Sequence, residues 1–121
     1  EIEPLVGPSS ILLALMASGF SGQSFVFHGY LPIEKPNRIR KIELLEKEVL
    51  KTGQTQIFME TPYRNNAILE DLLQNCHPET LLSISADLKS EETFSKTLSI
   101  QQWKSQIPDL HKKPCIFLLG R

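Results

Sequence analysis

The chain has 121 residues, of which 40% are hydrophobic and 22% are charged, and this size and composition predict one globular domain with a single core. Its net charge of −1 provides no general attraction to nucleic acids or membranes, although a local basic surface is compatible with it. No apolar run approaches the ~20 residues that a membrane-spanning helix requires, and nothing in the sequence resembles a signal peptide.

The two cysteines, Cys76 and Cys115, lie far apart and lack a Cys-x-x-Cys or Cys/His spacing. The sequence therefore predicts neither a disulfide framework nor a metal site, and a reducing cytoplasm is the expected location. Residues 1–6 form a polar stretch with two glutamates and one proline, and the sequence does not begin with methionine. We expect them to be the end of an interdomain linker, and residues 7–121 to be the C-terminal domain of a longer protein.

A Gly-Pro-Ser turn leads directly into the first apolar segment, which predicts a helix that ends at Gly19. Pro8 suits the first helical position because its missing N–H would have no partner there, and Ser9 can satisfy one of the unpaired amides of the first turn. Such a helix start can also hold an anionic group of a ligand. Taken alone, the segment favours a capped core helix over a ligand site.

Helical and strand patterns alternate along the rest of the chain. We expect strands at residues 24–30, 55–59, 81–86, 94–98 and 114–119, and helices at 37–51, from Pro62 to about 73, and after Ser99. Asn37 and Thr61 are the expected N-caps of the first two of these helices. Ile107 is expected on the apolar face of the last one. The segment between the third and fourth strands is too short for a helical crossover, so the pattern predicts an α/β fold with a five-stranded mixed sheet and about four helices.

Several short motifs occur in a particular order: the Gly-Pro-Ser helix, Gly-Tyr-Leu-Pro at 29–32, a basic helix, Met-Glu-Thr-Pro-Tyr-Arg at 59–64, and a final strand that begins with proline. This order resembles the C-terminal half of the tetrapyrrole (corrin/porphyrin) methylase family. Within that family the chain is most similar to bacterial enzymes that methylate a ribose 2′-hydroxyl of small-subunit ribosomal RNA, whose pattern has Pro-Gly-Pro-Ser, Gly-Phe-Leu-Pro and Tyr-Glu-Ser-Pro-His-Arg at these places. The similarity covers nearly the whole chain.

The resemblance implies a methyltransferase with two α/β domains, which binds S-adenosylmethionine between them and is usually a homodimer. It also implies that the C-terminal half contacts the cofactor with residues at strand ends and at the first turn. By position these residues are Pro8, Ser9, Met59, Ala86, Pro114 and Cys115. An alternative is that the fold serves as a binding or regulatory module that holds the cofactor without methylating anything.

Two groups of residues are candidates for contacting the methyl acceptor. Glu60 and Arg64 flank the start of a helix, where they form either an oriented site or an ordinary surface ion pair. Lys35, in the loop before the predicted helix, and Arg38, on that helix, begin a basic concentration that could bind phosphates, yet its interleaved glutamates also fit an ordinary solvated face. His28 is expected to be a hydrogen-bonded surface residue.

The acceptor itself is not determined by the motifs. The ribosomal enzymes carry an Arg-Glu-Leu-Thr-Lys run after the middle strand, where this chain reads Ala-Asp-Leu-Lys-Ser at 86–90 and lacks the arginine. A tetrapyrrole carbon and a ribosomal RNA ribose therefore both stay open as acceptors. A ribose hydroxyl requires a base, for which Glu60, Asp87 and Lys89 are the candidates, and no catalytic residue is assigned.

Overall fold

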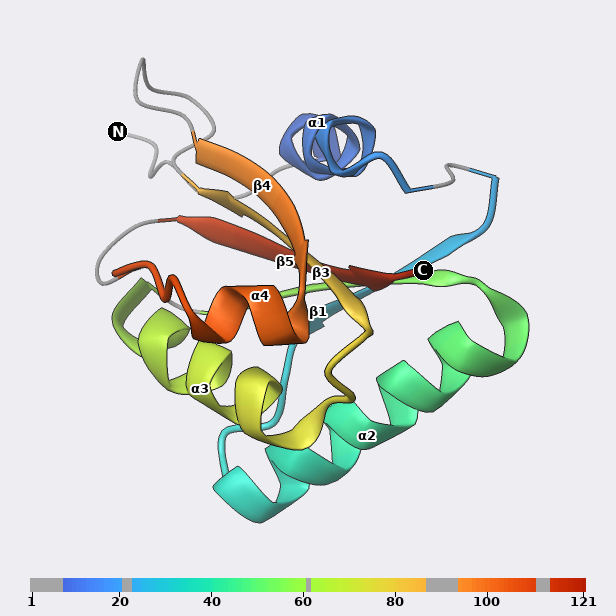
Figure 1. The fold of residues 1–121 in the computed structure, drawn as a ribbon. Coiled ribbons are helices and arrows are strands. Elements are labelled where there is room, and N and C mark those ends of the chain that lie inside the picture. Colours follow the sequence, from blue (N-terminus) through green and yellow to red (C-terminus); the bar gives the residue numbers. More distant parts are fainter. Residues whose placement is uncertain (1–7, 21–22, 61, 87–93, 111–113) are drawn as a thin grey trace.

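The fold was obtained as a computed structural model that describes residues 8–20, 23–60, 62–86, 94–110 and 114–121. Its elements follow one another along the chain as shown in Figure 1. They are α1 (Pro8–Ser18), β1 (Phe25–Tyr30), α2 (Lys35–Thr52), β2 (Thr55–Met59), the 3-10 helix η1 (Pro62–Arg64), α3 (Asn65–Asn75), β3 (Leu81–Ala86), β4 (Phe94–Ser99), α4 (Ile100–Lys104) and β5 (Cys115–Gly120).

The five strands form one mixed sheet in the order β1-β2-β5-β3-β4. β1 and β2 are parallel, whereas β5 is antiparallel to both of its neighbours and β3 is antiparallel to β4. The predicted α/β class and the mixed sheet are therefore confirmed. The last strand of the chain lies in the centre of the sheet, and all six of its residues are buried.

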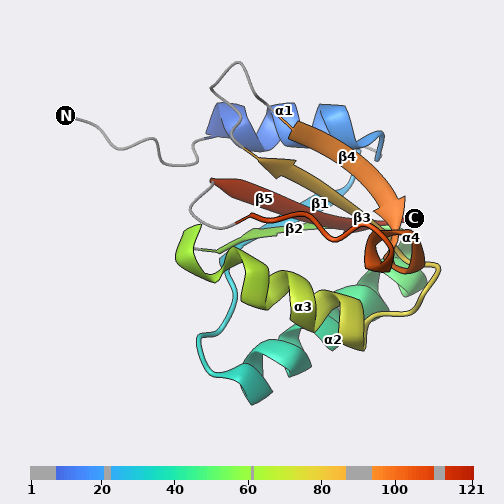
Figure 2. The ribbon, with the colours of Figure 1, turned by 60° about the vertical axis from the view of Figure 1, so that its left-hand side comes forward.

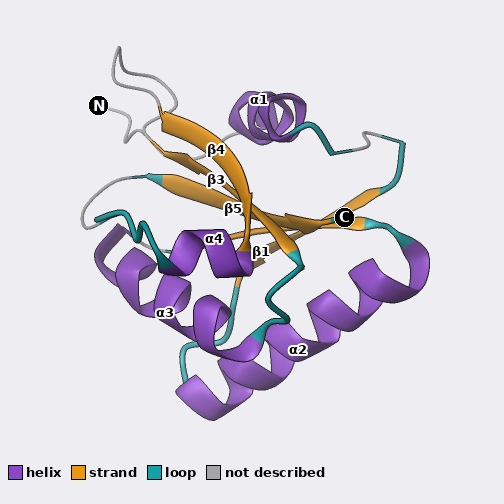
Figure 3. Ribbon diagram, in the orientation of Figure 1, coloured by secondary structure: helices purple, strands orange, loops and turns teal. Residues whose placement is uncertain are grey.

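Helices cover both faces of the sheet (Figures 1 and 3). α1 lies on one face, against β3, β4 and β5, and α2, α3 and α4 lie on the other. On the α1 face, Ala14 and Leu15 pack against Ile57, Ile116 and Leu118. On the opposite face the larger core includes the stacked rings of Phe58 and Phe117, whose centroids are 5.8 Å apart, together with the buried side chains of Ile42, Val49, Leu72 and Trp103.

The ends of the helices agree with the predicted stop and start signals in most places. Gly19 and Gly53 have positive φ angles of 80° and 77° at the ends of α1 and α2, a conformation that glycine adopts without strain. Ser99 caps α4 in a reciprocal capping box with Gln102. α1 begins at Pro8, as predicted.

Three boundary predictions are wrong or fall outside the described residues. α2 begins at Lys35, two residues before the predicted cap Asn37, because Pro36 fits its first turn and Glu34 takes the N-cap position without a side-chain cap. Thr61 lies outside the described residues, and a turn of 3-10 helix precedes α3. Ile107 lies beyond the end of α4 and is 62% exposed, so it is no part of that helix's buried face.

Gly120, at the end of β5, is required by close packing. A Cβ atom at this position would lie 2.8 Å from Cγ and Cδ2 of the Phe20 ring, which packs on the α1 side of the sheet. We expect Gly120→Ala to lower the free energy of unfolding by about 1–3 kcal/mol, measured by urea denaturation, because the ring has to move. In a Phe20→Ala background the same substitution is expected to cost much less. Equal stability of wild type and Gly120→Ala would contradict this packing.

Candidate functional site

Three of the segments predicted to contact the cofactor lie side by side at one end of the sheet. Ala86, the last residue of β3, is paired with Cys115, the first residue of β5. Met59, the last residue of β2, is paired with Ile116, one residue further along β5. Pro114 directly precedes Cys115 and is half-buried. Because β5 lies between β2 and β3, it brings residues that are distant in sequence to the same end of the sheet.

The start of α1 lies at this same end. Figure 2 shows that α1 begins on the side of the molecule where β3 ends and β5 starts. Pro8 and Ser9 are the first residues of α1, and their side chains lie outside the described part of the chain. We call this end of the sheet, defined by Met59, Ala86 and Cys115, the strand-end site.

The exposed fractions of these residues differ. Ala86 and Cys115 are each 1% exposed, whereas Met59 is half-buried and lies next to Tyr30 of β1, which is 55% exposed. The side chain of Met59 is on the α1 face, because its neighbour Ile116 belongs to the core cluster of that face. Met59 and Pro114 are therefore the predicted cofactor residues whose described side chains a ligand could reach.

Glu60 and Arg64 form an ion pair beside the strand-end site, with 3.3 Å between Arg64 Nη2 and Glu60 Oε1. The Glu60 side chain is fully buried and that of Arg64 is 33% exposed. The pair is thus brought together as the sequence predicts, with the carboxylate on the inside. The other two candidate bases, Asp87 and Lys89, lie outside the described residues.

Lys35 and Arg38 meet at Asp71 of α3, a residue that no sequence pattern singled out. Arg38 Nε lies 2.6 Å from Asp71 Oδ2, and Lys35 Nζ lies 3.2 Å from Asp71 Oδ1. Arg38 is 7% exposed and Asp71 is 1% exposed. Most of the Arg38 guanidinium is therefore engaged inside the protein, whereas Lys35 remains accessible from outside. Periodicity placed Asp71 on α3 but contained no signal that it is buried.

His28 lies on the α2 and α3 side of β1, opposite the face of Phe25 and Phe27. Its Nε2 is 2.6 Å from Oε1 of Gln56, and the ring is half-buried. The prediction of a hydrogen-bonded histidine is confirmed. Among the residues described here, no cluster of three or more His, Cys, Asp or Glu side chains is arranged to hold a metal ion.

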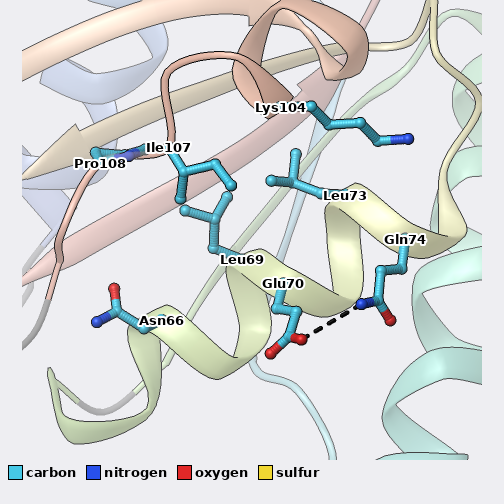
Figure 4. Close-up of a pocket in the computed structure, with 8 residues that line it drawn as sticks. All are labelled: Asn66, Leu69, Glu70, Leu73, Gln74, Lys104, Ile107 and Pro108. Atoms are coloured by element: carbon cyan, nitrogen blue, oxygen red, sulfur yellow. Dashed lines mark hydrogen bonds between the residues drawn. The ribbon is translucent and has the colours of Figure 1, made fainter.

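A groove that the sequence does not predict runs between α3 and the segment after α4 (Figure 4). It has a volume of about 490 Å³ and is lined by Asn66, Leu69, Glu70, Leu73, Gln74, Lys104, Ile107 and Pro108. Leu69, Leu73 and Ile107 provide its apolar part, and Glu70 accepts a hydrogen bond from Gln74 at its rim. None of the predicted site residues lines this groove.

No family model matches the chain, but several known proteins have similar sequences. Ribosomal RNA small subunit methyltransferase I of Vibrio cholerae is 37% identical over 95 residues, which cover 78% of this chain and 32% of the relative. The protein of the same name from Thermotoga maritima is 38% identical over 74 residues, covering 61% and 31%, and that from Buchnera aphidicola is 28% identical over 122 residues, covering 98% and 41%. The chain thus spans between 31% and 41% of the length of these three relatives.

Among solved structures, the methyltransferase CobJ superposes with a TM-score of 0.57 over 92% of this chain and 47% of the CobJ chain, at 16% sequence identity. At this identity the match shows the fold alone. The architecture is therefore that of an α/β domain with the fold of the matching region of CobJ. Together with the named relatives, it identifies the chain more particularly as a tetrapyrrole methylase-like C-terminal domain, as the order of its motifs predicts.

Where the described residues form helices, none of these helices is both long and apolar enough to cross a membrane. Neither cysteine forms a disulfide, and both thiols are buried. Burial and, to a smaller extent, the nearby carboxylates of Glu46 and Glu43 raise the pKa of the Cys76 thiol to about 12.

The raised pKa of Cys76 predicts how stability changes at alkaline pH. In the unfolded chain the thiol ionises near its ordinary pKa of 9.0, whereas in the folded protein it keeps its proton up to about 12. Between these values the stabilising contribution of the neutral thiol is lost by about 1.4 kcal/mol per pH unit. We expect the difference in unfolding free energy between wild type and Cys76→Ala, measured by denaturation between about pH 8 and 10.5, to shrink as pH rises. A difference that is constant with pH would contradict the burial of this thiol.

Proposed function

We propose that this domain is the C-terminal part of an S-adenosylmethionine-dependent methyltransferase in which the cofactor binds at the strand-end site. The observation that carries the proposal is that Met59, Ala86 and Cys115 lie together at one end of the sheet, on the side of the molecule where α1 begins. Met59 presents a half-buried apolar side chain on the α1 face, and Ala86 and Cys115 present strand-end backbone, since their side chains are buried in the core of the opposite face. Such a surface suits the flat, neutral adenine ring, which binds by packing and by a few hydrogen bonds.

The residues of the strand-end site have simple roles in this proposal. Met59 packs against the adenine, since its side chain is flexible and polarizable and is the accessible one of the three. Pro114 adds a half-buried ring, and Ala86 and Cys115 contribute strand-end backbone, because their side chains belong to the core of the opposite face. The first turn of α1 at Pro8 and Ser9 offers free amides to polar groups of the cofactor. The cofactor supplies an electrophilic methyl group when it is bound.

For methyl transfer, the main task of the protein is to orient the methyl donor and the acceptor. The methyl donor and the accepting atom must be held about 3–3.5 Å apart and in line, with water excluded. We propose an N-terminal domain that covers the strand-end site from the other side, with residues 1–6 as the end of the linker. The buried Glu60, fixed by Arg64, lies beside this site and is the described candidate for receiving a proton from a hydroxyl acceptor.

Ribosomal RNA of the small subunit is the acceptor that we propose. The support is that the relatives from Vibrio cholerae and Thermotoga maritima bear the name of a methyltransferase for this RNA. Lys35 is an exposed cation at the start of α2, shortly after the end of β1 that pairs with Met59, and it suits contact with a phosphate. A cytoplasmic location follows from this acceptor.

A homodimer is also proposed, as the resemblance implies. The outward side of α1 carries Leu12, Leu13 and Met16, which are 52%, 52% and 76% exposed. α1 contains no charged residue, so a second copy could pack against this stripe without placing like charges together.

The cofactor proposal predicts the effect of a charge at position 59. We expect Met59→Asp in the intact protein to weaken the binding of S-adenosylmethionine more than about tenfold, or ~1.4 kcal/mol, because a carboxylate would lose water in an apolar slot. Isothermal titration calorimetry measures this, and Met59→Leu is the matched control that is expected to bind nearly normally. If a folded Met59→Asp protein keeps wild-type affinity, the adenine does not lie at the strand-end site.

The acceptor proposal predicts a missing methyl group. In a strain that lacks the gene, mass spectrometry of small-subunit ribosomal RNA is expected to show the loss of a ribose methylation, because the enzyme that orients this ribose is absent. Wild-type protein restores the methyl group, and Met59→Asp is expected to restore little of it. Unchanged ribosomal RNA together with the loss of methyl groups from a tetrapyrrole precursor would overturn the RNA acceptor and retain the wider methyltransferase proposal.

A further inference from the structure

A buried carboxylate organises the segment between β1 and α2. Asp71 of α3 binds the Arg38 guanidinium with Oδ2, at 2.6 Å, and the Lys35 ammonium with Oδ1, at 3.2 Å. Both cations come from the first turns of α2, and Asp71 is 1% exposed. Since each carboxylate oxygen holds a different side chain, Asp71 fixes the start of α2 in two places.

Arg38 extends this contact to the chain that precedes α2. Its Nη1 donates to the carbonyl oxygen of Ile33 at 3.0 Å, and its backbone N–H donates to the carbonyl oxygen of Glu34 at 2.9 Å. At the other end of the same segment, Leu31 is 2% exposed and belongs to the core. Residues 31–34, which we call the β1–α2 segment, are thus held by the core at one end and by Arg38 at the other.

The charges in this group are unequal. Arg38 and Lys35 supply two positive charges and Asp71 supplies one negative charge, so one positive charge remains uncompensated within the group. The Arg38 side chain is 8% exposed, whereas the Lys35 side chain is 57% exposed. A ligand from solvent therefore meets the charge at Lys35, because Arg38 already neutralises Asp71 on the inside.

The β1–α2 segment lies beside the strand-end site. It follows Tyr30, which is paired with Met59. Figure 2 shows it leaving the sheet on the side where β5 starts and α3 begins. The start of α2, which carries Lys35, is on this side of the molecule, in the helix layer opposite α1.

We propose that Asp71 and Arg38 are positioning residues, which hold the β1–α2 segment so that the Lys35 ammonium contacts a phosphate of the RNA acceptor. This inference rests on the proposed function and changes the role that the sequence predicts for Arg38, from a substrate contact to an internal clamp. Arg38 suits this role, since its planar guanidinium binds a carboxylate and a carbonyl at the same time. Lysine at position 35 suits the other role, as a flexible point charge for a phosphate.

The direction in which Asp71→Asn changes RNA affinity distinguishes the positioning role from a purely electrostatic effect. Asp71→Asn removes a negative charge next to Lys35, so charge alone would strengthen RNA binding. Loss of positioning instead predicts about fivefold weaker binding, similar to the loss of one ionic contact. Glu70→Gln, one residue earlier on the exposed side of α3, makes the same change in net charge and is the matched control, expected to bind at least as well as wild type.

A second variant covers the case in which Asp71→Asn fails to fold. Arg38→Met combined with Asp71→Leu leaves the net charge unchanged and replaces a buried ion pair with apolar side chains, an exchange that proteins often tolerate. We expect this double variant to fold and to bind S-adenosylmethionine normally. We also expect faster hydrogen exchange at the amides of residues 33–35, because the contact with the Ile33 carbonyl is lost.

The closing experiment measures binding of the intact protein to small-subunit ribosomal RNA transcribed in vitro, at several salt concentrations. Lys35→Gln in the wild-type background is expected to weaken binding about fivefold and to lower the salt slope of log affinity by about 0.7. In the double-variant background, Lys35→Gln is expected to have no further effect, because Lys35 is no longer positioned.

The results distinguish a failure of the positioning role from a failure of the proposed function. Equal effects of Lys35→Gln in both backgrounds, or tighter binding by Asp71→Asn, would overturn the positioning role while leaving the proposed function intact. Wild-type protein that does not bind this RNA would overturn the proposed acceptor instead. If the wild-type protein does not bind this RNA, hydrogen exchange still tests whether Asp71 and Arg38 hold the β1–α2 segment. Unchanged exchange at residues 33–35 in the double variant would show that they do not.

Discussion

The insertion of β5 between β2 and β3 is the constraint on which the rest of the structure depends. β5 is the last element of the chain, yet both of its edges are paired and both of its faces are covered. Ile116 and Leu118 face α1, and Phe117 and Leu119 face the helices of the opposite layer. Without β5, the β1–β2 pair and the β3–β4 pair would be separate two-stranded ribbons with little stability of their own. The strand-end site exists because this one strand joins them.

Buried carboxylates act at the loops and in the helix layer, while the central strand β5 is apolar. Glu46 of α2 accepts hydrogen bonds from the His77 amide at 2.7 Å and the Thr80 hydroxyl at 2.5 Å, which fixes the connection from α3 to β3. Asp71 fixes the start of α2. A carboxylate removed from water is stable only when such donors replace its hydration. The apolar core therefore sets the positions of the strands, and these carboxylates set the conformation of the chain between elements.

Most of the secondary structure could be predicted because the signals are local. Glycines at helix ends, Ser99 before α4 and alternating apolar residues are signals that depend only on residues close to them in sequence. The start of α2 was misplaced because Asn37 is a good cap by type, while Pro36 made an earlier start equally favourable. The burial of Asp71 could not be predicted, since an aspartate on an amphipathic helix resembles any solvated one until its distant partners, Lys35 and Arg38, are known. Periodicity also contains no information on strand order, because the pairing of β5 with β2 and β3 joins segments that are distant in sequence.

The distribution of charge around the strand-end site bears on its chemistry. At the strand ends themselves, Met59, Ala86 and Cys115 carry no formal charge, whereas the Glu60–Arg64 pair follows directly after Met59 and Lys35 lies at the start of α2. Uncharged strand ends can orient a methyl donor and an acceptor, while charged side chains elsewhere bind phosphates of an RNA on either side of the acceptor. If charge alone determined acceptor binding, the exposed basic residues of α2 would be interchangeable. The clamp by Asp71 and Arg38 makes Lys35 different from them, because its position relative to Met59 is set by the core of the domain and not by an exposed helix surface.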